Sequence, residues 1–485
     1  MNSPEINIHD RASALRFLFG RINYERKDQI PYRSRDFKLD RMRRLLERLG
    51  QPQRGLPVVH IAGTKGKGST ASMIAGALVA AGYRTGLFTS PHIERLEERF
   101  VINGQSCLES QLVEVLADVA RQAVVMDRMA ELHGPAVGPT FFEITTAAAL
   151  LHFQRQNVDC AVLEVGLGGR LDSTNVCESI ISIITSISFD HTRQLGNSLA
   201  EIAGEKAGII RDEVPVITGV QQAEPFAVIR DIAQRHAAPL LALGRDFHCV
   251  CSDPVLVPLR RGEPADASVQ RTTLDYRERV GGVDWNLSNV RLRLVGAHQA
   301  ANAAVAIAAL QQLRRTGWNI STAAIRAGLE NAYCPARVEL VQQRPAVVVD
   351  AAHNAASVRA LLRVITHSIP SRRRLLLFAT SRDKKARAML EQLLPQFDRV
   401  FLTRFVTNPR AVEPQHLADL GHQVCHEKGL TRVELETLAD PETAWEAARQ
   451  WAEPDDLICI TGSFFLAAEL YHHFASPTAV VAECT

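Results

Sequence analysis

The feature that most constrains this chain is a repeated alternation of short, continuous apolar runs with helical segments. Residues 57–62 (PVVHIA), 158–166 (VDCAVLEVG) and 178–188 (ESIISIITSIS) are apolar along their whole length. Segments with helical character, such as residues 111–132 and 142–156, stand between them. Strands that are apolar on both faces and alternate with helices are typical of a parallel sheet covered on both sides. The sequence therefore predicts an α/β fold.

Two series of this kind follow one another along the chain. The first ends in a polar, arginine-rich stretch at residues 246–293, whose alternation predicts a small antiparallel β subdomain. The second begins at residue 345 and contains the strands PAVVVDAA, RRLLLFATS, DRVFLTRF and DDLICITGS. We expect a phosphate-loop ATPase domain with a parallel sheet and the small β subdomain over residues 1–295. A second, Rossmann-like α/β domain is expected over residues 296–485.

The bulk composition argues against several kinds of partner. The formal net charge is +2, which gives no electrostatic reason to expect nucleic acid or a membrane surface. No apolar stretch reaches membrane-spanning length, and the N-terminus lacks the features of a signal peptide. The nine cysteines are scattered without a CxxC pair, as is usual for reduced thiols. We expect a cytoplasmic protein whose partners are small molecules.

A glycine-rich segment, HIAGTKGKGST, lies between a predicted strand and a helix predicted over residues 69–82. Glycines let the backbone curl so that its N–H groups face an anion, and the helix start adds its positive dipole end. The spacing is shorter than the usual GxxxxGK[ST], with Gly68 between Lys67 and Ser69. A simple glycine-rich turn is the less favoured alternative. The predicted ATP-binding residues of the loop are Gly63, Thr64, Gly66, Lys67, Gly68, Ser69 and Thr70.

Polar side chains stand at the ends of three further predicted strands. Glu164 ends one strand, Asp190 and His191 follow the next, and Ser90 follows a third. In open α/β sheets the carboxyl ends of the strands form the ligand crevice. Ser90, Glu164 and His191 are therefore candidate Mg²⁺ ligands, although each alone would more commonly be a capping or loop residue.

Seven segments in order resemble the motifs of the folylpolyglutamate synthase/dihydrofolate synthase family of the Mur-ligase superfamily. The resemblance extends from about residue 37 to residue 472. It implies an ATP-dependent acid–amino-acid ligase of folate biosynthesis and one-carbon metabolism, acting as a monomer. The segments are HIAGTKGKGST, TSPHIERLEERFVINGQ, PTFFEITTA, LEVGLGGRLDSTNV, DHTRQLGNSLAEIAGEKAG, LVGAHQAANAAVA and TGSFFLAAEL.

The resemblance also implies roles for individual residues. The implied catalytic residues are Lys67, Lys206 and His353. The lysine that matches Lys206 is carbamylated in several members of the family, and the alternative for Lys206 is an ordinary lysine in a salt bridge. Two Mg²⁺ ions would bind beside ATP, with a monovalent cation as a further candidate. For Phe142, core packing is as well supported as stacking on a pterin. The implied contacts are Asn302, Arg337 and Asp350 for the nucleotide, Ser90, Glu164 and His191 for the metal, and Thr140, Phe142 and Asp172 for the pterin.

The implied reaction joins L-glutamate to dihydropteroate, to (tetrahydro)folate or to both, through an acyl phosphate. Alternatives within the ligases are a monofunctional folylpolyglutamate synthase and a Mur-type ligase with another acid substrate. A cell-wall Mur ligase is disfavoured because only about 50 residues precede the loop. A transporter, switch or chaperone ATPase and an inactive binding protein are the remaining alternatives.

The sequence departs from the family pattern at a few places. Lys65 stands where many relatives have asparagine, PARVE replaces W-P-G-R-x-E, and DAAHNAAS lacks a proline after AHN. None of these departures removes a residue with an implied chemical role.

Overall fold

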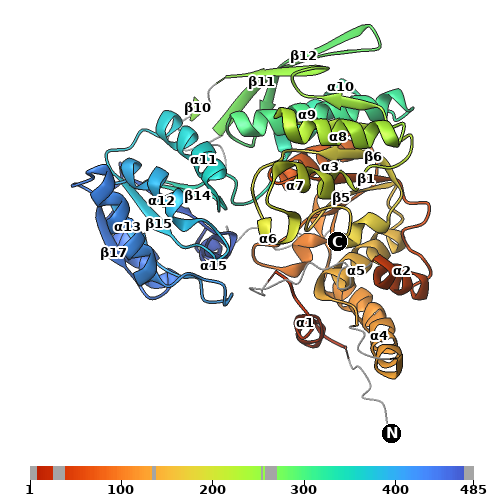
Figure 1. Cartoon of the computed structure of the whole chain (residues 1–485), viewed down its shortest axis with the longest axis horizontal. Helices are drawn as coiled ribbons and strands as arrows, with labels where there is room; N and C mark the ends of the chain where they lie inside the picture. Colours follow the sequence, from red (N-terminus) through yellow and green to blue (C-terminus); the bar gives the residue numbers. More distant parts are fainter. Residues whose placement is uncertain (1–7, 26–38, 134–137, 253–254, 257–269, 475–485) are drawn as a thin grey trace, which may run out of the picture. The chain divides into compact units, whose positions relative to one another are not determined.

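The chain forms two compact units in the computed structural model. Unit 1 comprises Met1–Ser252 and Arg271–Cys334, and unit 2 comprises Asp253–Gln270 and Pro335–Thr485. Both are α/β structures with parallel sheets, which confirms the predicted fold class (Figure 1). The structure describes residues 8–25, 39–133, 138–252, 255–256 and 270–474.

The main sheet of unit 1 has eight strands in the order β4-β3-β2-β5-β1-β6-β7-β8. Neighbours from β2 to β8 are parallel, whereas β3 and β4 extend one edge in antiparallel pairing. The strands are β1 (Val58–Ala62), β2 (Thr85–Phe88), β3 (Val101–Ile102), β4 (Gln105–Ser106), β5 (Cys160–Glu164), β6 (Ser179–Ile184), β7 (Val216–Thr218) and β8 (Leu240–Ala242).

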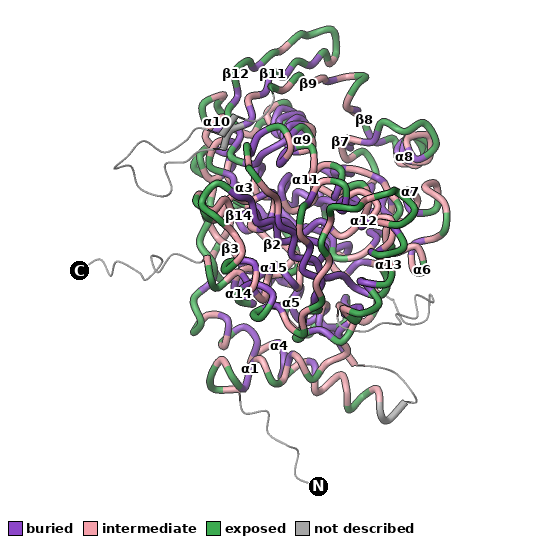
Figure 2. Tube along the Cα trace, turned by 90° about the vertical axis from the view of Figure 1, so that its left-hand side faces the viewer, coloured by how far each residue is buried: buried purple, intermediate pink, exposed green. Residues whose placement is uncertain are grey.

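The continuous apolar runs are explained by two cores, one on each face of this sheet. Along β1, Val58 packs into one apolar cluster, and Val59 and Ile61 pack into another. Because side chains alternate along a strand, a sheet buried on both faces needs an apolar residue at every position. Every residue of β1 and of β5 is buried, and Figure 2 colours the buried residues purple.

Helices cover both faces of the unit 1 sheet. The helices α1, α2, α4 and α5 contribute to the cluster that contains Val58, whereas α3, α9 and α10 contribute to the cluster that contains Val59. The helices are α1 (Arg11–Phe19), α2 (Leu39–Arg48), α3 (Lys67–Ala80), η1 (Leu96–Arg99), α4 (Glu109–His133), α5 (Phe141–Arg155), η2 (Ser173–Val176), α6 (Thr192–Leu195), α7 (Leu199–Ala207), α8 (Ala223–Arg235), α9 (Ala297–Arg315) and α10 (Thr322–Asn331).

An antiparallel ribbon follows the main sheet, as the alternation at residues 246–293 predicts. Strand β11 (Gln270–Val280) pairs with β9 (Phe247–Cys251) on one side and with β12 (Val283–Leu292) on the other. The short β10 (Val255–Leu256) precedes β11.

The boundary between the units lies further along the chain than residue 295. Both α9 and α10 pack on α3, so they belong to unit 1, and the division falls between Cys334 and Pro335. The glycine and valine near residue 295 mark the start of α9 rather than a separation of compact bodies, because α9 completes the core over β1 and β6.

Unit 2 has a six-stranded sheet in the order β13-β14-β18-β15-β16-β17. Only the edge pair β13–β14 is antiparallel among these strands. The strands are β13 (Glu339–Gln343), β14 (Ala346–Val349), β15 (Arg374–Phe378), β16 (Arg399–Leu402), β17 (Glu434–Thr437) and β18 (Leu457–Thr461). The helices are α11 (Ala355–Ser368), α12 (Ala386–Leu393), η4 (Leu394–Gln396), α13 (Pro414–Lys428), α14 (Pro441–Trp451), α15 (Phe464–Leu470) and η5 (Tyr471–His473). Among the described residues, no helix has the length and apolar character needed to cross a membrane.

The close packing of α10 on α3 generates a stability prediction. A side chain at Gly328 would overlap the backbone of Ala77, so Gly328→Ala must push the two helices apart. We expect it to lower the free energy of unfolding by about 1–3 kcal/mol, measured by urea denaturation. Gly204→Ala in α7 is the matched control, because a methyl group there meets nothing within 4 Å. Equal midpoints for the two variants would contradict the close packing.

Candidate active site

The phosphate loop joins β1 to α3. Helix α3 begins at Lys67, and its N-cap Gly66 has a φ of +84° and makes no side-chain capping hydrogen bond. The first N–H groups of a helix have no partner within the helix, and an uncapped start presents them to an anion together with the helix dipole. The loop therefore has the form of a phosphate-binding helix start.

The backbone around Gly66 is closely surrounded. A Cβ atom at Gly66 would overlap the side chain of Asn302, and one at Gly63 would overlap Thr185. Asn302 lies on α9, far along the sequence, and its Nδ2 donates to Gln299. The structure thus places Asn302, implied as a nucleotide contact, directly against the phosphate loop.

The hydroxyl residues of the loop differ in their surroundings, since one contacts the segment after β6 and two are buried in α3. Thr64 is tied to the segment after β6, since its N–H donates to the Ser186 carbonyl at 2.7 Å. Ser69 and Thr70 lie buried in the first turn of α3. The Thr70 hydroxyl is buried without a hydrogen-bond partner within the described part of the chain.

Glu164 connects the loop to the neighbouring strand ends. Its Oε1 lies 3.7 Å from the Nζ of Lys67, and its Oε2 accepts a hydrogen bond from the Ser90 N–H at 3.3 Å. A Cβ at Gly68 would lie 3.4 Å from Oε2 of Glu164, an ordinary van der Waals separation, so the carboxylate lies next to the helix start. The structure therefore brings Lys67, Ser90 and Glu164 together.

His191 is held by a different set of contacts. Its backbone N–H donates to the Oδ1 of Asp190 at 3.0 Å, and it has a φ of 49° at the start of α6. The other oxygen of Asp190 pairs with the Nζ of Lys65 at 2.9 Å. Lys65, visible in the sequence only as a departure from the family pattern, thus bridges the phosphate loop to the segment of His191.

Lys206 is buried beneath the same loop. Its Nζ donates to the carbonyl of Gly63 at 2.9 Å. Burial, with the nearby charges of Lys67 and Lys65, lowers the pKa of Lys206 from 10.5 to about 7. A lysine with this pKa is substantially in the neutral amine form near neutral pH, the form that carbamylation requires.

The predicted pterin residue Asp172 is engaged within its own segment. Its Oδ2 accepts from the N–H groups of Gly166 and Leu167, and its Oδ1 accepts from the N–H and hydroxyl of Thr174. Burial raises the pKa of the Asp172 carboxyl, and these hydrogen bonds oppose the rise. This network holds the turn after β5, whereas the pterin contact stays a prediction.

Sequence reasoning did not single out His60, which completes this network. It is fully buried on β1, and burial lowers its pKa to about 3, so the ring is neutral. Its Nε2 lies 2.8 Å from the Thr174 hydroxyl, which itself donates to Asp172. The sequence did contain one indication of this role, because His60 is the polar residue in a strand that is otherwise apolar.

The other two predicted pterin residues lie at the start of α5. Thr140 is its N-cap, and its hydroxyl exchanges hydrogen bonds with Glu143. The Phe142 ring lies against Gly166, immediately after β5, and 5.9 Å from the ring of Phe88. Phe142 is therefore packed at the same end of β5 as Glu164, and its stacking on a pterin stays a prediction.

Unit 2 gathers the remaining predicted residues around one loop. Asp350 accepts from the N–H groups of Val338 and Ala352, both at 2.8 Å, and so fixes the loop that carries Arg337. The Nδ1 of His353 lies 2.8 Å from the Ala351 carbonyl. Since a carbonyl only accepts, Nδ1 donates, and in the neutral ring the lone pair is on Nε2.

Comparison with known proteins places both units in one family. The Mur ligase middle domain matches residues 61–310, and the Mur ligase glutamate ligase domain matches residues 336–464. The chain is 34% identical to the dihydrofolate synthase/folylpolyglutamate synthase of Bacillus subtilis over 434 residues, 89% of this chain and 94% of that protein. It is 33% identical to the folylpolyglutamate synthase of Lacticaseibacillus casei, over 87% of this chain and 91% of that protein.

Solved structures agree with this comparison. Folylpolyglutamate synthase of Mycobacterium tuberculosis, complexed with ADP and AMPPCP, has a TM-score of 0.81 and 30% identity, covering 97% of this chain and 100% of that chain. E. coli FolC, in complex with DHPP and ADP, has a TM-score of 0.78 and 29% identity, covering 97% of this chain and 99% of that chain.

The lowered pKa of Lys206 predicts a pH dependence of stability. The unfolded chain, with a pKa near 10.5, binds a proton that the folded chain lacks between about pH 7 and pH 10.5. The free energy of unfolding should therefore rise with pH through this window in the wild type, relative to Lys206→Met. Denaturation across the window measures the difference, with the exposed Lys428→Met as control. Parallel curves for wild type and Lys206→Met would refute the lowered pKa.

The four donors to Asp172 predict that Asp172→Asn is a stability variant. An amide group cannot accept all four hydrogen bonds, so at least one buried donor loses its partner. We expect a loss of about 1–3 kcal/mol in the free energy of unfolding. Asp212→Asn is the control, because the Asp212 side chain is 87% exposed. Unchanged stability with a raised KM for the pteroate substrate would instead favour direct pterin contact.

Proposed function

Because this chain belongs to the dihydrofolate synthase/folylpolyglutamate synthase family of Mur ligases, we propose that it joins L-glutamate to dihydropteroate and to (tetrahydro)folate, using ATP. The chain is an ATP-dependent amide ligase. The observation that carries its assignment is the uncapped start of α3 with Lys67, Ser90 and Glu164 around it. This arrangement suits a phosphoryl-transfer site, in which charge neutralisation and positioning supply most of the catalysis.

The residues near the loop fit a magnesium ion. Glu164 offers a carboxylate and Ser90 a hydroxyl, which are oxygen donors of the kind Mg²⁺ prefers. The close approach of Glu164 to Gly68 puts this carboxylate beside the proposed phosphate position. When bound, Mg²⁺ would neutralise charge on the phosphates. Ser90, Glu164 and His191 remain the proposed ligands, and His191 would join them through the segment that Asp190 holds.

The proposed chemistry has two steps. An oxygen of the substrate carboxylate attacks the γ-phosphorus of ATP, and the bond to ADP breaks, giving an acyl phosphate. The glutamate nitrogen then attacks the acyl carbon, the carbon–oxygen bond breaks, and phosphate leaves as the nitrogen loses a proton. Lys67 and the α3 N–H groups would stabilise charge on the transferred group.

Two residues of unit 2 have proposed roles, Arg337 in the phosphoryl transfer and His353 in the second step. Arg337 would neutralise phosphate charge, and the Nε2 of His353 would accept the proton from the glutamate nitrogen. Asp350 would act by holding the Arg337 loop, since its carboxylate already accepts two backbone hydrogen bonds. The adenine and ribose contacts of Asn302 and Asp350, and the carbamylation of Lys206, remain proposals.

Several broader expectations also remain proposals. They are the presence of both ligase activities in one chain, a monomeric state and a cytoplasmic location. The bifunctional names of relatives such as that of B. subtilis support the first of these.

Removal of the Lys67 ammonium tests the proposed function. Lys67→Ala should lower ATP- and glutamate-dependent amide formation by at least about 1000-fold, because the charge on the transferred phosphoryl group loses its partner. Product analysis with dihydropteroate and with tetrahydrofolate, side by side, measures the loss and separates the two activities. Lys428→Ala, an exposed lysine on α13, is the control. Undiminished amide formation by Lys67→Ala would overturn the assignment.

A further inference from the structure

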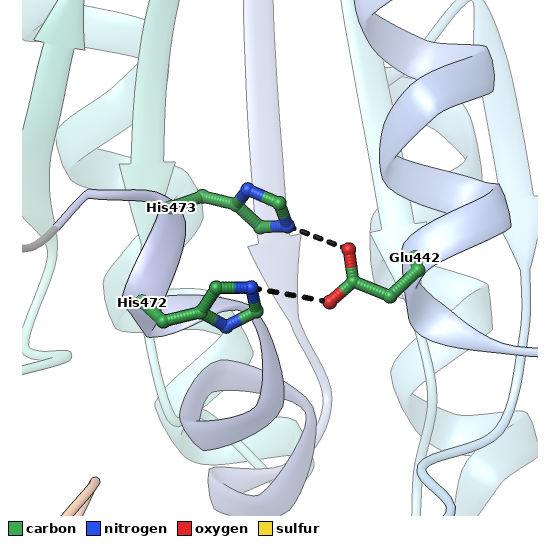
Figure 3. A group of neighbouring side chains, drawn as sticks. All are labelled: Glu442, His472 and His473. Atoms are coloured by element: carbon green, nitrogen blue, oxygen red, sulfur yellow. Dashed lines mark hydrogen bonds and ion pairs between the residues drawn. The ribbon is translucent and has the colours of Figure 1, made fainter.

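Three side chains at the surface of unit 2 point toward one another, well apart in sequence from the predicted site residues. Glu442 lies in the first turn of α14, and His472 and His473 lie on η5 (Figure 3). The Nε2 of His473 is 2.6 Å from Oε2 of Glu442, and the Nε2 of His472 is 3.5 Å from Oε1. One donor atom from each residue lies within 4.8 Å of the others.

Both sides of this cluster are anchored by neighbouring structure. Asp440 caps α14 by accepting from the Thr443 N–H at 2.9 Å, which fixes the turn that carries Glu442. On η5, the Tyr471 hydroxyl donates to Glu339 at 2.9 Å. The ring of His473 also lies 5.9 Å from that of Trp445, one helical turn beyond Glu442. The segments that carry the three donors are therefore fixed by neighbouring structure, and the ring of His473 also packs beside Trp445.

We propose that Glu442, His472 and His473 form a binding site for a divalent transition metal of the Zn²⁺ class. Two imidazoles and one carboxylate are a common ligand set for Zn²⁺, whereas Mg²⁺ prefers oxygen donors. The side chains of His472, His473 and Glu442 are 57%, 27% and 50% exposed, so water can complete the coordination. This site would differ in chemistry from the oxygen-rich site proposed beside the phosphate loop.

The donor atoms lie close enough for side-chain rotation to bring them around a metal, since all three are within 4.8 Å of one another. Zinc–ligand bonds of about 2.0–2.1 Å with tetrahedral angles place neighbouring donor atoms roughly 3.3 Å apart. The Nε2 of His472 lies 3.5 Å from Oε1 of Glu442 and the Nε2 of His473 lies 2.6 Å from Oε2, so the His473 contact must open and the side chains must turn toward one common position. Each ring would then carry its proton on Nδ1 and direct the Nε2 lone pair at the metal.

Metal binding here would connect α14 to η5. By mass action, an ion that binds the folded cluster stabilises unit 2 against unfolding. Through Tyr471 and Glu339 the same turn contacts the Arg337 loop, because Glu339 also accepts from the Ala336 N–H at 2.8 Å. The proposal does not depend on the ligase assignment, since it rests on residues outside the phosphate loop.

Calorimetric titration of the chelator-treated full chain with ZnCl₂, without nucleotide, tests the site. The wild type should bind one more equivalent of Zn²⁺ than the double variant His472→Gln/His473→Gln, and Glu442→Gln should bind that equivalent at least about tenfold more weakly. The exposed His422→Gln and Glu446→Gln, the latter on the same helix as Glu442, are matched controls and should behave as the wild type.

Other metal-binding side chains do not obscure this comparison, because they are shared by all the variants. Identical stoichiometry and affinity in the wild type and the double variant would overturn the proposal. A titration with MgCl₂ should give no difference between these two proteins, and a difference found with Mg²⁺ but not with Zn²⁺ would overturn the assigned class of metal. Zn²⁺ should also raise the thermal midpoint of the wild type more than that of the double variant.

Discussion

The parallel register of β1 between β5 and β6 is the constraint on which the site in unit 1 depends. Ile61 is paired with Glu164 on one side, and Ala62 with Ile184 on the other. All three strands therefore end at the same rim, where the phosphate loop leaves β1. A shift of register would move Glu164 away from Lys67 and the Ser186 segment away from Thr64.

Charge balance is the second constraint on this rim. Lys65, Lys67 and Lys206 lie around one short loop, facing the carboxylates of Glu164 and Asp190. Burial favours the neutral form of Lys206, which lowers the positive charge around the loop. Lys65 and Lys67 are paired with Asp190 and Glu164. Without a ligand the loop is thus close to charge balance, so the charge of a bound polyphosphate calls for the Mg²⁺ proposed beside Glu164.

The sequence predicted what depends on local pattern. The apolar runs predicted β1, β5 and β6, and the glycine-rich segment predicted the start of α3. Both predictions were possible because strand burial and tight backbone turns depend on residues that are adjacent in sequence. Contacts between distant segments were not visible. The Lys65–Asp190 pair, the His60–Thr174–Asp172 network and the packing of α10 on α3 depend on how elements meet in space. The family resemblance implied ligand contacts for Asp172 and Asp350, but not that these carboxylates hold backbone turns.

In the proposed reaction, the substrate carboxylate is activated as an acyl phosphate. Ligation with dihydropteroate labelled with ¹⁸O in its carboxylate tests this most directly, with the released phosphate analysed by mass spectrometry. We expect one ¹⁸O atom in each phosphate released, because the oxygen that attacks ATP leaves with the phosphoryl group. Amide formation that releases unlabelled phosphate would contradict it.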